Sequence, residues 1–138
     1  MTTDEVKRLA ETEPGASAVL IGGEDDREAY YPAIVAFDDM TGRFVYDYGL
    51  LVKAFSKSLD DGATDDPETD AVEWIEFNVL RSLPYYGDRA PLILFRDEED
   101  GTVRDMQADQ KPVDDRLLKL YEYGMSSIES KEDDSNGD

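Results

Sequence analysis

Five residues of this chain have side chains that could build a small chemical site: Tyr46, Asp47, Glu76, Tyr85 and Tyr86. Tyrosine joins an apolar ring to a polar hydroxyl, and a carboxylate in a cleft can act as a general acid or base. The group therefore predicts a small-ligand site or a carboxylate-based hydrolytic site near Tyr46, Glu76 and Tyr85. The alternatives are packing of the tyrosines at the edge of the core and a hydrogen-bonded structural role for Glu76.

Most enzyme chemistries are excluded by what the chain lacks. It contains no histidine and no cysteine, so nucleophilic catalysis with a histidine base is absent, as are disulfides and thiolate metal sites. The acidic segment 97–105 does not match the ligand spacing of a calcium-binding loop. We expect no cofactor and no metal, and we assign no catalytic residue. The absence of these residue types favours a non-enzymatic role.

A second group of candidate residues lies on a predicted helix over 67–83. Residues spaced for one face of this helix are apolar, and they are Ala71, Val72, Ile75, Val79 and Leu83. Trp74, Phe77 and Arg81 fall on the opposite side, with Asn78 at one margin. A helix that is apolar nearly all round must be covered all round. It is therefore either a central helix packed beneath others, or it presents Trp74, Phe77, Asn78 and Arg81 to a partner, since Trp and Arg anchor interfaces.

The charge of the chain points to its environment. Asp and Glu number 34 against 14 Lys and Arg, which gives a net charge of −20 in 138 residues. Self-repulsion on this scale destabilises a compact state, and molar salt removes most of that penalty because the Debye length falls to about 3 Å. The even spread of acids resembles cytoplasmic proteins of salt-in halophilic archaea. The alternatives are an acidic nucleic-acid mimic and a binder of a basic partner.

The same charge argues against two classes of partner. Nucleic-acid phosphates and anionic lipids would both be repelled by so acidic a surface. No apolar run reaches the length of a membrane span, and the first residues have no signal-peptide pattern. We therefore expect a cytoplasmic protein that binds neither nucleic acid nor membrane.

The predicted elements alternate between helices and short strands. A helix begins at the capping-box spacing of Thr2 and Glu5, and a strand is expected within 16–23. A hairpin with arms 33–37 and 44–46 precedes a helix over about 48–59, capped by Asp47.

The second half also alternates helices with a hairpin. The helix over 67–83 begins at Asp66 and Pro67, a hairpin follows with arms 92–95 and 102–104, and a final helix opens after Pro112. The order α-β-ββ-α-α-ββ-α predicts one α+β domain over 1–130, with a mostly antiparallel sheet of about five strands and helices on one face. Residues 131–138 are predicted to be a disordered acidic tail.

One stretch resembles a known group of proteins. The run Val45-Tyr46-Asp47-Tyr48, the later run Ala71-Val72-Glu73-Trp74-Ile75-Glu76-Phe77-Asn78, and then Gly87 and Ala90-Pro91-Leu92-Ile93 are similar to small uncharacterised prokaryotic and phage-borne proteins. The acidic insert 60–66 and the longer final helix depart from that pattern. The resemblance covers 32–95, implies the same order of elements and carries no activity. It draws attention to Tyr46, Asp47, Glu76, Phe77 and Asn78.

Our leading hypothesis from the sequence is a non-enzymatic α+β domain of a halophile that acts through protein–protein contact as a homodimer. The small-ligand or hydrolytic site and the nucleic-acid mimic remain the alternatives.

Overall fold

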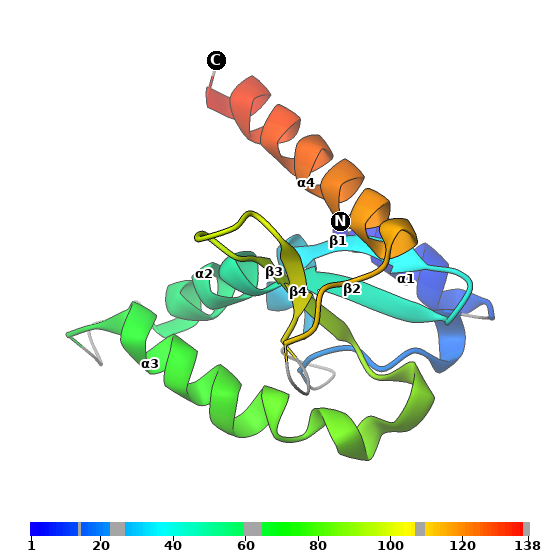
Figure 1. Ribbon diagram of the computed structural model, residues 1–138, viewed down its shortest axis with the longest axis horizontal. Coiled ribbons are helices and arrows are strands. Elements are labelled where there is room, and N and C mark those ends of the chain that lie inside the picture. The colour runs from blue at the N-terminus through cyan, green and yellow to red at the C-terminus, as the bar shows by residue number, and fades with distance from the viewer. Residues whose placement is uncertain (14, 23–26, 60–64, 107–109, 137–138) are drawn as a thin grey trace.

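The computed structural model describes residues 1–13, 15–22, 27–59, 65–106 and 110–136 (Figure 1). Residues 60–64 of the acidic insert lie outside this part of the chain. The elements in chain order are helix α1 (Thr3–Glu11), the short 3₁₀ segments η1 (Gly15–Ser17) and η2 (Arg27–Ala33), strands β1 (Ile34–Asp38) and β2 (Arg43–Asp47), helices α2 (Tyr48–Leu59) and α3 (Pro67–Trp74), the π-helical turn η3 (Ile75–Leu80), the 3₁₀ segment η4 (Leu83–Arg89), strands β3 (Leu92–Arg96) and β4 (Val103–Asp105), and helix α4 (Asp115–Asn136).

The described residues form a four-stranded mixed sheet in the order β1-β2-β3-β4. The pairs β1–β2 and β3–β4 are antiparallel hairpins, as predicted, whereas β2 and β3 pair in parallel with Val45 opposite Leu92. A parallel pair requires a long crossover connection, and α2, α3, η3 and η4 supply it. The α+β class is confirmed, but the expectation of a mostly antiparallel sheet of about five strands is corrected in both respects.

The fifth predicted strand, within 16–23, is not a strand in its described part. Val19 N donates to the distant backbone oxygen of Arg89 at 3.0 Å, and Ile21 N donates to the hydroxyl of Tyr46 at 3.1 Å. Ala18 and Leu20 pack against the core beside buried Ile21. The apolar run therefore packs on the core without joining the sheet. A short apolar run does not by itself distinguish a strand from such a segment.

Helices cover both faces of the sheet, which corrects the prediction that they lie on one face. Phe44, Tyr46 and Ile93 point into a core shared with α1, η2, α2 and α3. Their neighbours Val45 and Leu94 point into a second core under α4. Successive strand residues alternate between faces, so continuous apolar strands are buried on two sides. Figure 1 shows α4 crossing one side of the sheet, with α2 and α3 on the other.

Helix α4 is held against the sheet by a close crossing and two buried carboxylates. Gly124 lies so near β1 that a Cβ added to it would be 2.0 Å from the carbonyl oxygen of Val35. Arg116 donates to Asp38 at the end of β1, and Tyr121 donates to Asp47 at the end of β2. Asp38 and Asp47 are the two buried carboxylates among the described residues, and both have donors on α4.

Helix starts follow the predicted capping residues. The side chain of Thr2 and the backbone N–H of Glu5 form the expected capping box of α1, and Asp66 accepts from Thr69 N at 3.2 Å at the start of α3. Asp47 accepts from Leu50 N at 2.9 Å in the first turn of α2. The helix α4 extends to Asn136 and so overlaps the segment 131–138, whose assignment as a tail remains a prediction.

Replacing Gly124 with alanine tests the close crossing. The new methyl group would collide with the backbone of Val35, and overpacking of this kind costs about 1–3 kcal/mol. We expect Gly124→Ala to lower the free energy of unfolding in urea, although alanine favours a helix over glycine by about 1 kcal/mol. Ser126→Ala, at an exposed position of the same helix, should change stability by less than about 0.5 kcal/mol. Equal stability of both variants would contradict the crossing.

Asp38 predicts a pH-dependent contribution to stability. Burial raises its pKa, but hydrogen bonds from Arg116, Thr41 and the backbone N–H of Met40 outweigh burial and hold the pKa below its usual value. A carboxyl whose folded pKa is lowered contributes its stability above the unfolded pKa of about 3.9, and that contribution is lost as pH falls through the folded value.

Accordingly, Asp38→Asn should lower the free energy of unfolding by about 1–3 kcal/mol near neutral pH. The difference from the unmodified protein should shrink as pH falls below about 4. Urea denaturation over a pH series measures both effects. The exposed neighbour Asp39 supplies the control, Asp39→Asn, which should have little effect. A stability gap that does not change with pH would argue against this role for Asp38.

Candidate interaction surface

The segment that follows residue 66 is the most unusual element of the fold. The predicted single helix over 67–83 is divided into α3, the π-helical turn η3 and the start of η4. Its inner face is the predicted one, with Ala71, Ile75, Val79 and Leu83 buried in the core. A π-helical turn is rare and is frequently found at functional sites. The outer face of this segment is therefore a candidate functional surface.

The outer face carries exposed aromatic and cationic side chains. Phe77 is 67% exposed and Trp74 38% exposed, so this helix is not covered all round within the described chain. The guanidinium carbon of Arg81 lies 5.1 Å from the ring centroid of Phe77, a cation–π contact. We refer to Trp74, Phe77, Asn78 and Arg81 as the aromatic face. Its residues are the predicted interface candidates, and the structure brings them together on one exposed surface.

Trp74 is held in place from beneath. Its ring stacks on Phe55 of α2 with the centroids 4.3 Å apart and the planes 18° apart. Phe55 in turn stacks on Tyr30 of η2 at 6.1 Å. Because Phe55 and Tyr30 are buried, the stack runs from the core to the surface and fixes the orientation of the indole.

Asn78 and Glu76 have different surroundings. The side-chain amide of Asn78 donates to the backbone carbonyl oxygen of Trp74 at 3.1 Å, and the backbone carbonyl oxygen of Asn78 accepts from the hydroxyl of Ser82 at 2.8 Å. Both bonds run from a side chain to the backbone carbonyl oxygen four residues earlier, a pattern that often bends helices. Glu76 is exposed and acts on Tyr48, whose pKa is raised by burial and then by the negative charge of Glu76.

The predicted pocket residues are dispersed over the molecule. Tyr46 is fully buried, its hydroxyl accepts from Ile21 N, and burial raises its pKa far above the ordinary value. Tyr85 is 88% exposed on η4, and Tyr86 is also exposed. A sealed Tyr46 and a fully solvated Tyr85 cannot line one cavity. The geometry thus gives no support to a site shared by Tyr46, Glu76 and Tyr85.

Asp47 borders a groove of about 700 Å³ at the carboxyl ends of the parallel strands β2 and β3. This is where ligands often bind in sheets with parallel strands. However, Oδ2 of Asp47 accepts from Leu50 N and Oδ1 accepts from the hydroxyl of Tyr121. Burial, followed by the hydrogen bond to Asp47, raises the pKa of Tyr121. Both carboxylate oxygens are therefore engaged in holding α2 and α4.

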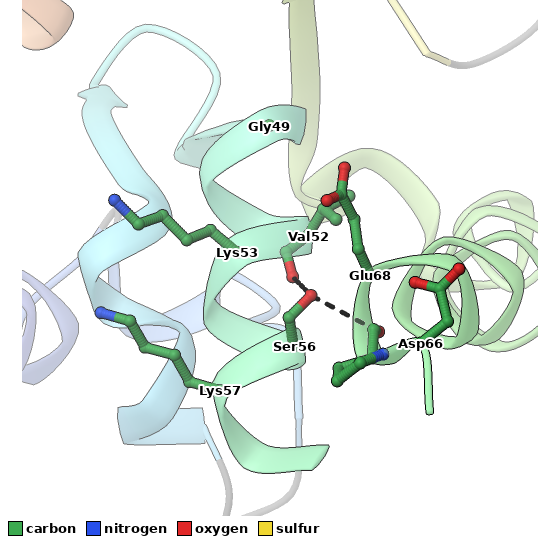
Figure 2. Close-up of a pocket in the computed structure, with 8 residues that line it drawn as sticks. Gly49, Val52, Lys53, Ser56, Lys57, Asp66 and Glu68 are labelled. Atoms are coloured by element: carbon green, nitrogen blue, oxygen red, sulfur yellow. Dashed lines mark hydrogen bonds between the residues drawn. The ribbon is translucent and has the colours of Figure 1, made fainter. Parts of the chain in front are cut away.

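A groove of about 580 Å³ runs between α2 and the start of α3 (Figure 2). The hydroxyl of Ser56 donates to the carbonyl oxygen of Val52 at 2.8 Å and lies 3.5 Å from that of Pro67, so it ties the two helices together. Lys53 and Lys57 border one side, and Asp66 and Glu68 the other. Sequence reasoning missed these two lysines, although their spacing of four positions on a predicted helix was a usable signal.

Comparisons of the chain with protein-family models, with curated proteins and with solved structures found no match. The likeness to small prokaryotic and phage-borne proteins stays a prediction.

Among the described residues, no three or more Asp or Glu side chains are grouped so that they could hold a metal ion. No helix in the same part of the chain combines the length and the apolar character needed to span a bilayer.

Proposed function

We propose that this chain is a non-enzymatic interaction domain that forms a homodimer through the aromatic face. The observation that carries the proposal is the exposure of Trp74, Phe77 and Arg81 together on one outer surface. Trp and Arg are enriched among the residues that dominate binding energy at interfaces. The stacking of Trp74 on Phe55 supports the proposal, because an orientation fixed in advance reduces the entropy lost on binding.

A second copy of the same chain is the occupant that the charges favour. Acidic residues, including Asp70, lie near the start of α3, whereas Arg81 lies beyond the π-helical turn. If two copies of this segment cross antiparallel about a two-fold axis, Trp74 of each copy meets Phe77 of the other. The same axis brings Arg81 of each copy to Asp70 of the other. Such an isologous contact is self-complementary in both shape and charge.

The distribution of acids supports adaptation to high salt. Among the carboxylates whose exposure the structure describes, all but Asp38 and Asp47 lie at least partly exposed, so this charge lies outside an ordinary apolar core. We infer a halophilic, archaeal-type cytoplasmic protein, in which concentrated salt screens the repulsion within and between copies. A nucleic-acid mimic, which needs carboxylates arranged as phosphates are along a duplex, remains the alternative.

Unfolding at a series of KCl concentrations tests the salt adaptation. We expect the free energy of unfolding, measured with urea, to rise steadily up to about 1 M KCl as the Debye length falls to about 3 Å. The rise should continue beyond about 0.15 M, where an ordinary protein changes little. Full stability at low salt, with no further rise, would remove the case for a halophilic protein.

Light scattering on a size-exclusion column in about 1 M KCl tests the homodimer. We expect a dimer, and we expect Phe77→Asp to weaken self-association at least about tenfold, as loss of a central interface anchor does. Tyr123→Asp is the matched control, because Tyr123 on α4 is 77% exposed, slightly more than Phe77, and lies outside the aromatic face. A monomer at all protein concentrations, or equal effects of the two variants, would overturn the proposal.

A charge exchange tests the antiparallel arrangement. Asp70→Arg and Arg81→Asp should each weaken the dimer, and the double variant should restore most of the affinity. These residues are eleven positions apart on one segment, too far to face each other within a chain, so restoration would report contact between chains. If the double variant is as weak as the single ones, the antiparallel pairing is wrong even where a dimer forms.

A further inference from the structure

Lys53 and Lys57 form an unusual pair on α2. They lie four positions apart, so they occupy neighbouring places on one side of the helix, where like charges are unfavourable. Both side chains are exposed. Within the described residues no carboxylate oxygen lies within 4.0 Å of Lys53 or Lys57, as is also true of Arg8 and Lys119. The pair is distinguished by two like charges on neighbouring turns of one helix in a very acidic chain.

An apolar groove begins beside this pair. It lies between η2, α2 and α4, has a volume of about 420 Å³, and is lined by Lys53, Lys57, Ala29, Pro32, Leu50, Ala54 and Ile128. Apart from the two lysines, every lining side chain is aliphatic. The volume falls within the range of about 300–1,000 Å³ that is usual for small-ligand pockets, which are mostly apolar with a few polar groups that fix orientation.

The lysine side chains are directed towards the η2 side of α2. Figure 2 shows both ammonium groups projecting from the side of the helix opposite Asp66 and Glu68. Their aliphatic stems can lie along the apolar wall while the ammonium groups stay in water. Asp66 and Glu68 therefore do not lie between the two ammonium groups and the apolar groove.

We propose that this groove binds a small amphipathic anion with one acidic head group, such as a carboxylate, and a short apolar tail. The head group pairs with the ammonium groups of Lys53 and Lys57, which also relieves their mutual repulsion. The tail lies against Ala29, Pro32 and Ala54, where burial of each methylene is favourable. A single negative charge suits this site because a polyanion would also meet the acidic surface around it.

This site is independent of the homodimer, since its lining comes from η2, α2 and α4 and contains no residue of the aromatic face. Failure of one proposal therefore leaves the other standing.

Titration of the ¹⁵N-labelled protein, observed by amide NMR, tests the proposal with three probes: hexanoate, acetate and 1-hexanol. All are added at one KCl concentration at which circular dichroism shows the protein folded. We expect hexanoate to shift the amides of Ala29, Ala54 and Ile128. Its affinity should exceed that of acetate at least about tenfold because of its longer tail. It should also exceed that of 1-hexanol, because the alcohol carries no charge for the lysines.

Variants separate this site from general anion binding. Lys53→Gln combined with Lys57→Gln should weaken hexanoate binding at least about fivefold, since charge-assisted bonds are lost. Lys119→Gln, at an exposed lysine of α4 outside the groove, should leave the affinity within about twofold. Hexanoate shifts located elsewhere, equal binding of acetate and hexanoate, or equal effects of the two lysine changes would each overturn the site.

Discussion

The arrangement of this protein depends on the hydrogen bonds that the buried carboxylate of Asp47 accepts. It is the last residue of β2, its carboxylate accepts from Leu50 N in the first turn of α2, and it also accepts from the hydroxyl of Tyr121 on α4. One buried side chain thus links the central strand to a helix on each face of the sheet. A buried carboxylate that loses a donor is strongly destabilising, so these three elements depend on one another for their positions.

So acidic a chain can fold in layers because its interior is apolar on both sides of the sheet. The strands β2 and β3 are apolar on both sides, and the helices pack against the two cores that these strands separate. Where carboxylates do enter the interior, α4 supplies a donor to each. The remaining described acids meet water or a partner at the surface, and the net charge therefore governs solvation and association more than the fold.

The local features of the fold could be predicted from the sequence, and the long-range ones could not. The capping residues Thr2 and Asp66 and the two hairpins follow from short-range chemistry. The parallel contact of β2 with β3 depends on how the crossover between them folds, which no local pattern records. The continuous apolar runs 44–46 and 92–94 did carry a signal of burial on both faces. Of the candidate site, the aromatic face was predicted residue by residue, whereas the lysine groove depends on three separate elements.

The stack that supports Trp74 has a practical meaning. Trp74 is the only tryptophan of the chain, and it sits where a buried ring system reaches the solvent. The intrinsic tryptophan fluorescence of this protein therefore arises from one point, at the boundary between core and surface. The protein carries a built-in optical probe of this boundary, one that needs no label and observes the aromatic face directly.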